Sequence, residues 1–418
     1  MLSLLNNVVY HITQLIQVII FIVGCYFFGI SIFGWIKKKE TYKKSFAPQK
    51  KFALIIAAHN EEKVIEHVIE SLFRQNYPKE LYDVFVIADN CTDKTAQIAS
   101  NHGALVYTRV DNEFCGKGHA LEWMFSKIFS MKEKYDAISV FDADNLVASN
   151  YLEEMNAKLC QGHKVVQGYI DSKNPYDSWI TCSYAIAFWL SNRIFQLPRY
   201  NLGLSCSLCG TGFCVNVDTL KQIGWGATCL TEDLEFTMKL ALSNQKVAWA
   251  HNAVVYDEKP LTLKQSWNQR MRWMQGHADC ASRFLRPLFK KAFKDSDLIS
   301  FDNAIYLFQP IRFIFIGLIT IMMWIQTVFP QSPFFSLKYV FPVGVWYIFA
   351  TLQFFYGPFI ILLEKKFSPK VLVAFLIYPF YCLTWMPITI QGFLRKNNKD
   401  WKHTHHSREI SINDLEKA

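Results

Sequence analysis

The sequence has little charge, since Asp, Glu, Lys and Arg make up only 19% of its 418 residues, against roughly 25% in an average soluble protein. Hydrophobic residues reach 51% and aromatic residues 16%. This composition excludes disordered, collagen-like and coiled-coil chains and favours a membrane enzyme. The formal net charge is +9. The basic residues cluster in a few segments of the chain, so the charge has to be explained by the roles of those segments.

Two nucleotide-binding signatures are also absent. No G-x-G-x-x-G follows the first predicted strand, which argues against a dinucleotide-binding oxidoreductase, and no G-x-x-x-x-G-K-[ST] is present, which excludes a P-loop NTPase. The eleven Cys are scattered, and we interpret them as reduced, small buried residues of a cytosolic domain. The single C-x-x-C, Cys206 and Cys209, has no second pair and no nearby His, so it is weak evidence for zinc.

An uncharged apolar run from Ile12 to Ile36 predicts a transmembrane helix, because such a run spans ~37 Å and a bilayer core is ~30 Å thick. A cleaved signal peptide does not fit, since the run is too long, has no basic segment before it and has no cleavage site after it. Seven Lys between Lys37 and Lys51 follow. Positive loops stay in the cytosol, so we expect the N-terminus outside and the following domain in the cytosol.

Three more apolar runs follow residue 300, namely Ala304 to Phe329, Val340 to Leu363 and Val371 to Gln391. Their length and near-absence of charge make buried core helices an unlikely alternative. A third full crossing would place the basic tail, Arg395 to Arg408, outside the cell. Prolines in that run allow a broken or re-entrant helix, so we expect the tail in the cytosol. The predicted organisation is an N-terminal membrane helix (1–36), a cytosolic domain (37–300), C-terminal membrane helices (301–394) and a basic tail (395–418).

The middle of the chain alternates between strand-like and helical patterns. Predicted strands are Phe52 to Ala58, Val84 to Ala88, Leu105 to Tyr107 and Ala137 to Phe141, with helices at 62–74, 93–101, 117–130 and 149–160 between them. This order predicts an α/β fold with a mostly parallel sheet and helices on both faces. Ligands bind beyond the carboxyl ends of such strands, where this sequence places polar residues.

Asp142 and Asp144 end the fourth predicted strand and point the same way in an extended segment. Such a pair suits Mg²⁺ or Mn²⁺, which would neutralise a diphosphate, although a solvated turn is an equally good interpretation of D-x-D alone. Lys117 opens a predicted helix, where an ammonium and main-chain N–H groups suit a phosphate. An ordinary capping turn explains Lys117 about as well.

Two later motifs also carry chemistry. Thr231-Glu232-Asp233 precedes an amphipathic helix, and Asp233 is a candidate general base for an acceptor hydroxyl; the alternative is a simple N-cap with acids in the first turn. In the motif Gln269-x-x-Arg272-Trp273, Arg272 suits a phosphate and Trp273 suits stacking on a sugar. The alternative is an amphipathic helix lying at the membrane surface.

Five motifs follow one another within one α/β domain, in the order A-H-N-E-E, A-D-N-x-T-D, D-A-D, T-E-D and Q-x-x-R-W. This ordered set resembles the motifs of the processive family 2 glycosyltransferases. That family includes hyaluronan, cellulose, chitin-oligosaccharide and poly-N-acetylglucosamine synthases. The resemblance covers residues 50–290 in detail and the flanking helices in layout. It implies a glycosyltransferase A-type, Rossmann-like cytosolic domain inserted between transmembrane helices, with interfacial amphipathic helices.

The resemblance also implies roles for single residues. The donor nucleotide and diphosphate would contact His59, Asn60, Glu61, Asp89, Lys117, Asp142 and Arg272. The acceptor would contact Cys209, Gly210, Thr211, Glu232, Gln269 and Trp273. Asp144, with Asp142, would bind Mg²⁺ or Mn²⁺, and Asp233 would be the base of an inverting transfer.

The implied partners are a UDP-sugar, a growing β-linked polysaccharide and the lipid bilayer of the cell membrane, with a possible small accessory membrane protein and no nucleic acid. Tyr176 to Gln196 and Arg283 to Lys294 are the predicted interfacial helices, although the first could be a core helix. Only one clear helix precedes the catalytic domain, so the layout is nearest to poly-N-acetylglucosamine synthases. Two alternatives stay open: transfer of one sugar to a lipid, and a catalytically dead transport or binding protein.

Overall fold

The computed structural model describes residues 2–37, 46–226, 228–398 and 408–417. Its strands are β1 (Phe52–Ala58), β2 (Tyr82–Asp89), β3 (Leu105–Arg109), β4 (Ala137–Asp142), β5 (Leu146–Val147), β6 (Val165–Ser172), β7 (Phe213–Asn216) and β8 (Val247–Asp257). The helices of the catalytic half are α2 (Ile65–Phe73), α3 (Thr95–Asn101), α4 (Lys117–Ser130), α5 (Tyr151–Cys160), α6 (Trp179–Ser191), α7 (Leu197–Asn201), α8 (Val217–Ile223), α9 (Glu232–Leu242) and α10 (Leu263–Asp295). The remaining helices are α1 (Leu2–Ile32), α11 (Leu298–Val328), α12 (Val343–Leu363), α13 (Pro369–Leu383), α14 (Trp385–Leu394) and α15 (Ile412–Lys417). Three short helical turns are η2 (Lys79–Leu81), η3 (Asn192–Gln196) and η4 (Leu337–Tyr339).

The eight strands form one sheet in the order β3-β2-β1-β4-β7-β6-β8-β5. The four strands predicted from the sequence are parallel neighbours, as expected. The second half differs from the predicted parallel arrangement, because β7 runs antiparallel to both β4 and β6. β7 begins beside the carboxyl end of β4, where Phe213 pairs with Val140. β7 therefore runs in the opposite direction to β4. This reversal places the turn before β7 at the same edge as Asp142.

Helices cover both faces of the sheet, as the strand-helix alternation predicts. One face packs on α2 and α5, through side chains such as Val68 and Leu152. The other face packs on α4, α6 and α9, through side chains such as Leu121, Trp189 and Phe236. Alternate residues of β1 enter the two cores, which is why this strand reads as a continuous apolar run. The carboxyl edge of the sheet is left for polar side chains.

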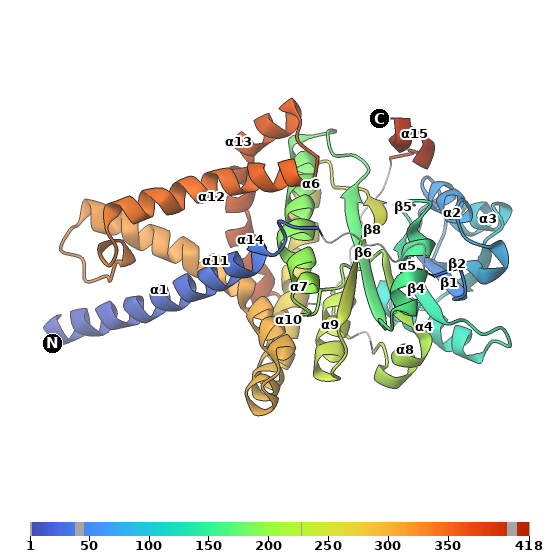
Figure 1. Cartoon of the computed structure of the whole chain (residues 1–418), viewed down its shortest axis with the longest axis horizontal. Helices are drawn as coiled ribbons and strands as arrows, with labels where there is room; N and C mark the ends of the chain where they lie inside the picture. Colours follow the sequence, from blue (N-terminus) through green and yellow to red (C-terminus); the bar gives the residue numbers. More distant parts are fainter. Residues whose placement is uncertain (1, 38–45, 227, 399–407, 418) are drawn as a thin grey trace.

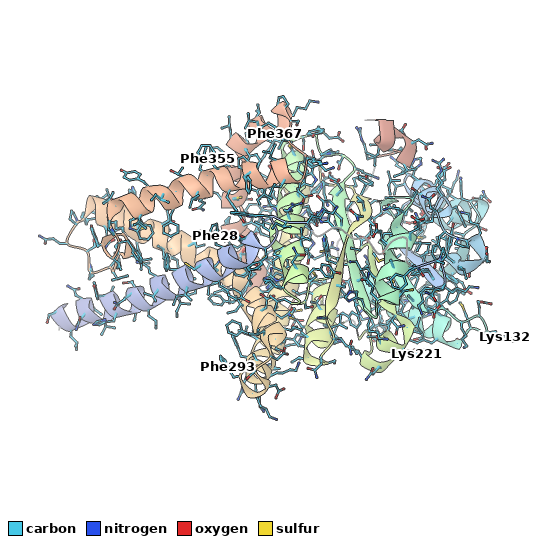
Figure 2. The ribbon with its side chains drawn as sticks, in the orientation of Figure 1. Phe28, Lys132, Lys221, Phe293, Phe355 and Phe367 are labelled. Carbon is cyan, nitrogen blue, oxygen red and sulfur yellow. The ribbon has the colours of Figure 1, made fainter. Side chains whose placement is uncertain are left out.

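Among the described residues, four helical stretches are long and apolar enough to cross a membrane: Ser3–Ile32, Leu298–Val328, Val343–Leu363 and Pro369–Leu394. α1, α11 and α12 extend together away from the catalytic domain (Figure 1). Figure 2 shows Phe355 on the outer side of α12, whereas Lys132 and Lys221 belong to the catalytic domain. Phe28 of α1 packs on Tyr356 of α12, with ring centroids 5.5 Å apart, so these two helices contact each other.

The fourth stretch takes a different course, since α13 and α14 run alongside α6 and α10 (Figure 1). The break between them falls at Thr384, three residues before Pro387, where the prolines of this run allow one. Contact with α10 is close, because a Cβ at Gly392 would meet Met274 within 3.0 Å. Pro379 lies within α13, whereas Pro387 lies in the first turn of α14 and cannot donate to the carbonyl of Leu383, the last residue of α13.

The predicted interfacial helices also need a correction. Residues 180–186 of α6 are buried one after another, so this helix is enclosed between the sheet and α13 rather than amphipathic. The basic stretch from Arg283 to Lys294 is the second half of α10, the same helix that carries Gln269, Arg272 and Trp273. One continuous 33-residue helix therefore links the predicted acceptor site to the basic surface.

Candidate active site

A cavity of about 570 Å³ opens at the carboxyl ends of β1, β2 and β4. Thirteen of the residues predicted from the sequence line it: His59, Glu61, Asp89, Lys117, Asp142, Asp144, Cys209, Gly210, Glu232, Asp233, Gln269, Arg272 and Trp273. Asn60 and Thr211, which the structure also describes, do not line the cavity. The motifs are up to 214 residues apart in the sequence, and the fold brings them to one site.

Asp89 is a buried acid that lines the cavity at the end of β2, and it is paired. The Arg109 guanidinium donates to Asp89 Oδ1 at 2.6 Å, and both side chains are buried. Burial raises the pKa of Asp89 above its ordinary value although Arg109 opposes the change. A ring nitrogen of His59 lies 2.7 Å from the Asp89 carbonyl, so β1 and β2 are tied together beside the site.

Arg109 was not predicted from the sequence. It ends β3 directly opposite Asp89 in the parallel register, and it also donates to Asp111 and to the Phe114 carbonyl. The sequence pattern ended this strand at Tyr107, two residues early. Had the predicted strand been extended to Arg109, its guanidinium would have been expected at the same edge of the sheet as Asp89.

Asn60 and Thr211 support the site from outside the cavity. Asn60 has a positive φ of 55°, and its Oδ1 accepts a hydrogen bond from the Thr92 N–H at 2.8 Å. Asn60 therefore joins the turn after β1 to the turn after β2. Thr211 Oγ1 accepts from the Asp142 N–H at 3.1 Å, so it fixes the backbone of one predicted metal ligand.

The two carboxylates of the D-x-D motif differ in their surroundings. Asp142 pairs with the Lys117 ammonium and keeps 35% of its side-chain surface exposed. Asp144 is 3% exposed, and its carboxylate accepts from the Glu258 N–H at 3.1 Å and from the Asn145 amide at 3.3 Å. Both line the same cavity. Carboxylate oxygens are the ligands that Mg²⁺ and Mn²⁺ prefer, so the donor set fits a hard divalent cation.

Lys117 joins three parts of the site. Its ammonium donates to Asp142 and, at 2.7 Å, to the Gly210 carbonyl. Burial alone would lower the pKa of Lys117, but Asp142, Glu232 and Asp233 reverse this effect and hold the pKa above its usual value. A fixed cation thus lies among the carboxylates, where a diphosphate would need one.

The turn Cys209-Gly210-Thr211 is held by Gln167, a residue that the sequence analysis missed. The Gln167 side chain accepts from the Cys209 N–H at 2.9 Å and donates to the Thr211 carbonyl at 2.9 Å. Gln167 is fully buried. It reaches the turn because β6 is the antiparallel neighbour of β7, a pairing that local sequence patterns do not reveal.

Glu232 and Asp233 begin α9, as the acidic first turn predicts. Burial and the neighbouring Glu232 raise the pKa of Asp233 to about 7, although the Leu234 N–H donates to its carboxylate. Burial also raises the pKa of Glu232, against the charges of Lys117 and Arg272. Asp233 is therefore suited to accept a proton near neutral pH.

Thr231 is the N-cap residue of α9, as the alternative predicts, but its side chain makes no capping hydrogen bond. Its side chain instead lies against Gly276 of α10, where a Cβ would overlap it. Glycine at 276 lets α10 approach the loop before α9. The predicted base and the predicted acceptor helix are thereby brought to the same cavity.

Trp273 packs within an aromatic cluster at the membrane side of the cavity. Its ring stacks on Trp385 of α14, with centroids 6.5 Å apart, and meets Tyr184 of α6 edge-on at 6.1 Å. Trp385 also lines the cavity. The sequence analysis missed it because it belongs to an apolar run that predicts only a membrane helix.

Arg270, between two predicted site residues, is fully buried. Its guanidinium lies over the rings of Tyr381 and Trp385 and donates to Thr384 Oγ1 at 2.8 Å. Thr384 is the break between α13 and α14. Arg270 therefore ties α10 to the break between these two helices.

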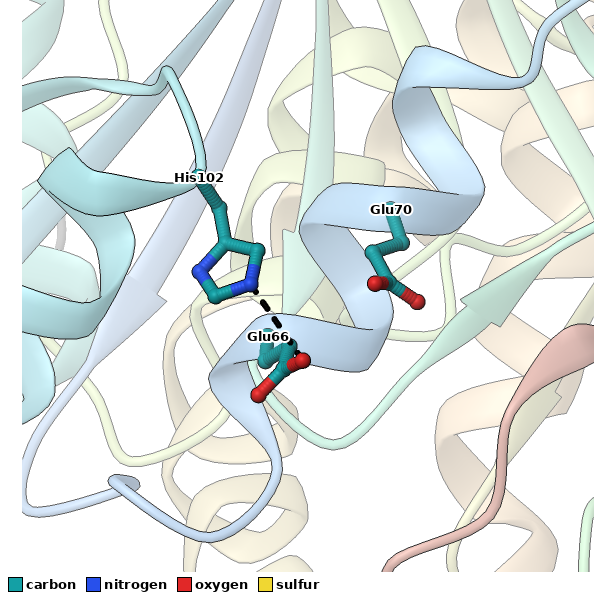
Figure 3. A group of neighbouring side chains, drawn as sticks. All are labelled: Glu66, Glu70 and His102. Atoms are coloured by element: carbon teal, nitrogen blue, oxygen red, sulfur yellow. Dashed lines mark ion pairs between the residues drawn. The ribbon is translucent and has the colours of Figure 1, made fainter.

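A separate group of possible metal ligands lies on the outer side of α2 and α3 (Figure 3). In the described chain, Glu66, Glu70 and His102 are the one group of three whose ligand atoms lie within 4.8 Å of one another. A ring nitrogen of His102 pairs with Glu66 at 3.2 Å. None of the three lines the cavity, so this group does not serve the site described above.

Comparison with known proteins gives a family match over the catalytic half. A family model described as "Glycosyltransferase like family 2" matches residues 48–276, which is more than half of the chain. Among curated proteins, the probable glycosyltransferase YdaM of Bacillus subtilis is 26% identical over 352 residues, 81% of each chain. A beta-monoglucosyldiacylglycerol synthase of Nostoc sp. is 31% identical over 54% of this chain and 48% of its own length. The chain thus matches only about half of that cyanobacterial enzyme.

Two further similarities complete the comparison. The poly-beta-1,6-N-acetyl-D-glucosamine synthase of Staphylococcus epidermidis is 25% identical over 62% of this chain and 64% of its own. The solved mannosyltransferase PcManGT from Pyrobaculum calidifontis, in complex with GDP-Man and Mn²⁺, superposes with a TM-score of 0.57 at 16% identity, over 91% of this chain and 99% of that chain. The structural likeness establishes a shared fold.

Proposed function

Because this chain belongs to the family 2 glycosyltransferases, we propose that it transfers a hexose or N-acetylhexosamine from a UDP-sugar to an acceptor hydroxyl, with inversion at the anomeric carbon. The observation that carries this proposal is the shared cavity, in which Asp233 with its pKa of about 7 lies among the residues of the D-x-D and Q-x-x-R-W motifs. His59 and Asp89 are assigned to the nucleoside of the donor.

In the proposed reaction, the acceptor oxygen forms a bond to the anomeric carbon while the bond from that carbon to the diphosphate oxygen breaks. The electron pair of the broken bond goes to the diphosphate. Asp233 accepts the proton of the acceptor hydroxyl, and Lys117 and Arg272 stabilise the charge that develops on the leaving group. Asp142 and Asp144 would hold a Mg²⁺ or Mn²⁺ ion, which neutralises diphosphate charge when bound.

We assign the acceptor to a growing β-linked polysaccharide. Support comes from the ordered motifs and from the aromatic pair Trp273 and Trp385 at the membrane side of the cavity. Stacking on a sugar face tolerates a shift in register better than hydrogen bonds do, which suits a polymer that advances by one unit per cycle. Coupling of synthesis to export through the membrane is part of the same proposal.

A second candidate acceptor is a diacylglycerol-type lipid, with one sugar added. The similarity to beta-monoglucosyldiacylglycerol synthases at 31% identity supports it, as does the position of the cavity beside helices that face the bilayer. The two candidates share all donor chemistry. They differ only in what Trp273 and Trp385 would contact.

The proposed topology has three crossings and a cytosolic catalytic domain. The domain contacts the end of α1, the start of α11 and the end of α12: Arg193 binds the Trp35 carbonyl at 2.9 Å and Glu364 at 3.0 Å, and Arg199 binds Asp302 at 2.7 Å. These ends must therefore lie on one side of the bilayer. We place α13 and α14 along that surface, so the tail is cytosolic and the N-terminus is outside.

Product analysis tests the proposal and separates the two acceptors. Purified protein in nanodiscs is incubated with radiolabelled UDP-hexoses and UDP-N-acetylhexosamines, with and without added diacylglycerol. A product ladder or polymer on a gel, independent of diacylglycerol, supports the polysaccharide. One sugar in the lipid extract, dependent on diacylglycerol, supports the second candidate. Absence of any transfer from the whole donor panel would contradict both.

A further inference from the structure

The C-terminal segment 408–417 lies on the catalytic domain, beyond the last apolar helix. The Arg408 N–H donates to Glu258 Oε2 at 3.2 Å, and the Arg408 guanidinium pairs with Asp177 at 3.1 Å. Further along, Asn413 accepts from the Arg74 guanidinium of α2, and Ile412 is buried. Figure 1 shows α15 beside α2 and β5. The segment is therefore attached to the domain at three separate points.

Arg408 contacts both loops that lead from the sheet to the helices at the membrane side. Asp177 belongs to the loop between β6 and α6, and Glu258 belongs to the loop between β8 and α10. The two loops are already joined by Asn174, which exchanges hydrogen bonds of 2.8 and 3.0 Å with the backbone of Lys259. Arg408 adds a further connection between them, from the C-terminal segment.

The loop after β8 also holds a predicted metal ligand. The Glu258 N–H donates to Asp144 Oδ2 at 3.1 Å, so the residue held by Arg408 helps to orient this carboxylate, beside the Asn145 amide on Oδ1. Lys173 completes the arrangement, because its ammonium binds both the Asp144 carbonyl at 2.9 Å and the Glu258 carboxylate at 3.1 Å. Lys173, Asp144 and Glu258 are each less than 10% exposed. The chain of contacts runs from Arg408 through Glu258 to Asp144.

We propose that the C-terminal segment is a positioning element for the metal site. The Arg408 guanidinium anchors the segment on Asp177, the Arg408 N–H then holds the Glu258 carboxylate, and the Glu258 N–H holds Asp144. This inference rests on the proposed function, because it takes Asp142 and Asp144 as the ligands of Mg²⁺ or Mn²⁺. Partners that orient metal ligands through hydrogen bonds typically change metal affinity about 10–100-fold when they are lost. Removal of the segment should therefore weaken metal binding without removing any ligand.

Mn²⁺ binding measured by electron paramagnetic resonance, with UDP present and no turnover, tests the inference on the full-length protein in detergent. Five variants are compared with wild type: a chain ending at residue 407, Arg408→Ala, Arg408→Asp, the charge swap Arg408→Asp with Asp177→Arg, and Glu409→Ala. Glu409 is an exposed neighbour on the same segment and is the matched control. Asp144→Asn is the reference for loss of the site.

We expect the dissociation constant for Mn²⁺ to rise about 10-fold in the truncated chain and several-fold in Arg408→Ala and Arg408→Asp. The charge swap should recover most of the loss, which general destabilisation of the domain would not allow, and Glu409→Ala should bind as wild type does. Wild-type affinity in the truncated chain, or no recovery in the charge swap, would overturn the inference. If Asp144→Asn binds Mn²⁺ as well as wild type, the proposed metal site itself is wrong and the inference falls with it.

Discussion

Gly210 lies directly against the carboxylate of Asp233: a Cβ built on this glycine would stand 3.5 Å from Asp233 Oδ2. The turn that carries Gly210 also gives its carbonyl to Lys117, which in turn pairs with Asp142. Three contacts thus link the proposed base Asp233, through Gly210 and Lys117, to the proposed metal ligand Asp142. Several consequences of this arrangement are measurable.

Replacement of Gly210 should reduce turnover beyond its effect on stability. The glycine has a φ of +77°, and an alanine there costs roughly 1–2 kcal/mol of backbone strain and adds a methyl group at the acceptor face of Asp233. Gly203 offers a matched control, with a φ of +74° and open space around its Cβ position. We expect Gly210→Ala and Gly203→Ala to lose similar thermal stability, while only Gly210→Ala loses kcat. Equal kcat in the two variants would show that the turn at Gly210 is not part of the acceptor site.

Loss of Arg109 should damage both stability and donor binding. Truncation of one partner of a buried ion pair typically costs about 3–5 kcal/mol, and Arg109→Ala would leave Asp89 buried with its pKa raised further. We expect Arg109→Ala to have a lower melting temperature in detergent and to bind UDP more weakly. Arg109→Lys should recover part of the loss, because it restores the positive charge but not the several N–H donors of the guanidinium. Lys132→Ala, on the exposed surface (Figure 2), is the control. Unchanged UDP affinity in Arg109→Ala would show that Asp89 does not serve the donor.

Arg272 and Trp273 should separate donor binding from acceptor binding. Both line the cavity, but Trp273 packs on Trp385 and Tyr184, whereas the charge of Arg272 acts on Glu232. We expect Arg272→Ala to weaken UDP binding, and Trp273→Ala to bind UDP normally while losing chain elongation.

Trp273→Phe decides whether Trp273 only anchors its helix. If it does, Trp273→Phe should keep product length and rate, and Trp273→Ala should mainly lower the yield of folded protein. Normal product at a normal rate from Trp273→Ala would contradict the stacking role.

The position of the tail is testable by labelling. A Cys at Glu409, in a background without the exposed Cys25, Cys115 and Cys382, should not react with a membrane-impermeant maleimide on intact cells and should react after permeabilisation. Gln331→Cys, in the connection between α11 and α12, is the matched control and should react on intact cells. Ser407, the site first suggested by the sequence, lies outside the described residues. Strong labelling of the Glu409 position on intact cells would mean that α13 and α14 cross the bilayer.

The sequence predicted the strand ends of the first half of the domain because each is a local pattern: an apolar run, then a polar cluster. His59, Asp89, Asp142 and Asp144 follow such runs, and all four line the cavity. The same reasoning placed Lys117 at a helix start, where the structure has it.

What the sequence did not predict depends on contacts between distant segments. Gln167 holds a turn of the site through the reversal of β7. Trp385 reaches the cavity through the packing of α14 on α10, where Arg270 lies against its ring. None of these pairings has a local signature. Glu258 was missed for the same reason, since its N–H meets Asp144 across 114 residues.

Asp233 is the proposed base, and its pKa is raised to about 7. We therefore expect both kcat/KM and the stability of the folded state to depend on pH. The free enzyme needs the carboxylate form, so kcat/KM should rise with pH and level off above about pH 7. The folded state holds a proton that the unfolded chain releases near pH 3.9. The stability that this group contributes is therefore present at low pH and lost as pH rises towards 7. Asp233→Asn should reduce this dependence of melting temperature on pH.

The most direct test of the account is UDP release from the best UDP-sugar by wild type and by Asp233→Asn at pH 8, measured beside UDP affinity for both. We expect Asp233→Asn to bind UDP as wild type does and to turn over about 10²–10⁴-fold more slowly, the usual contribution of a general base. Release at the wild-type rate, or loss of UDP binding in place of turnover, would contradict the role of Asp233 as the base.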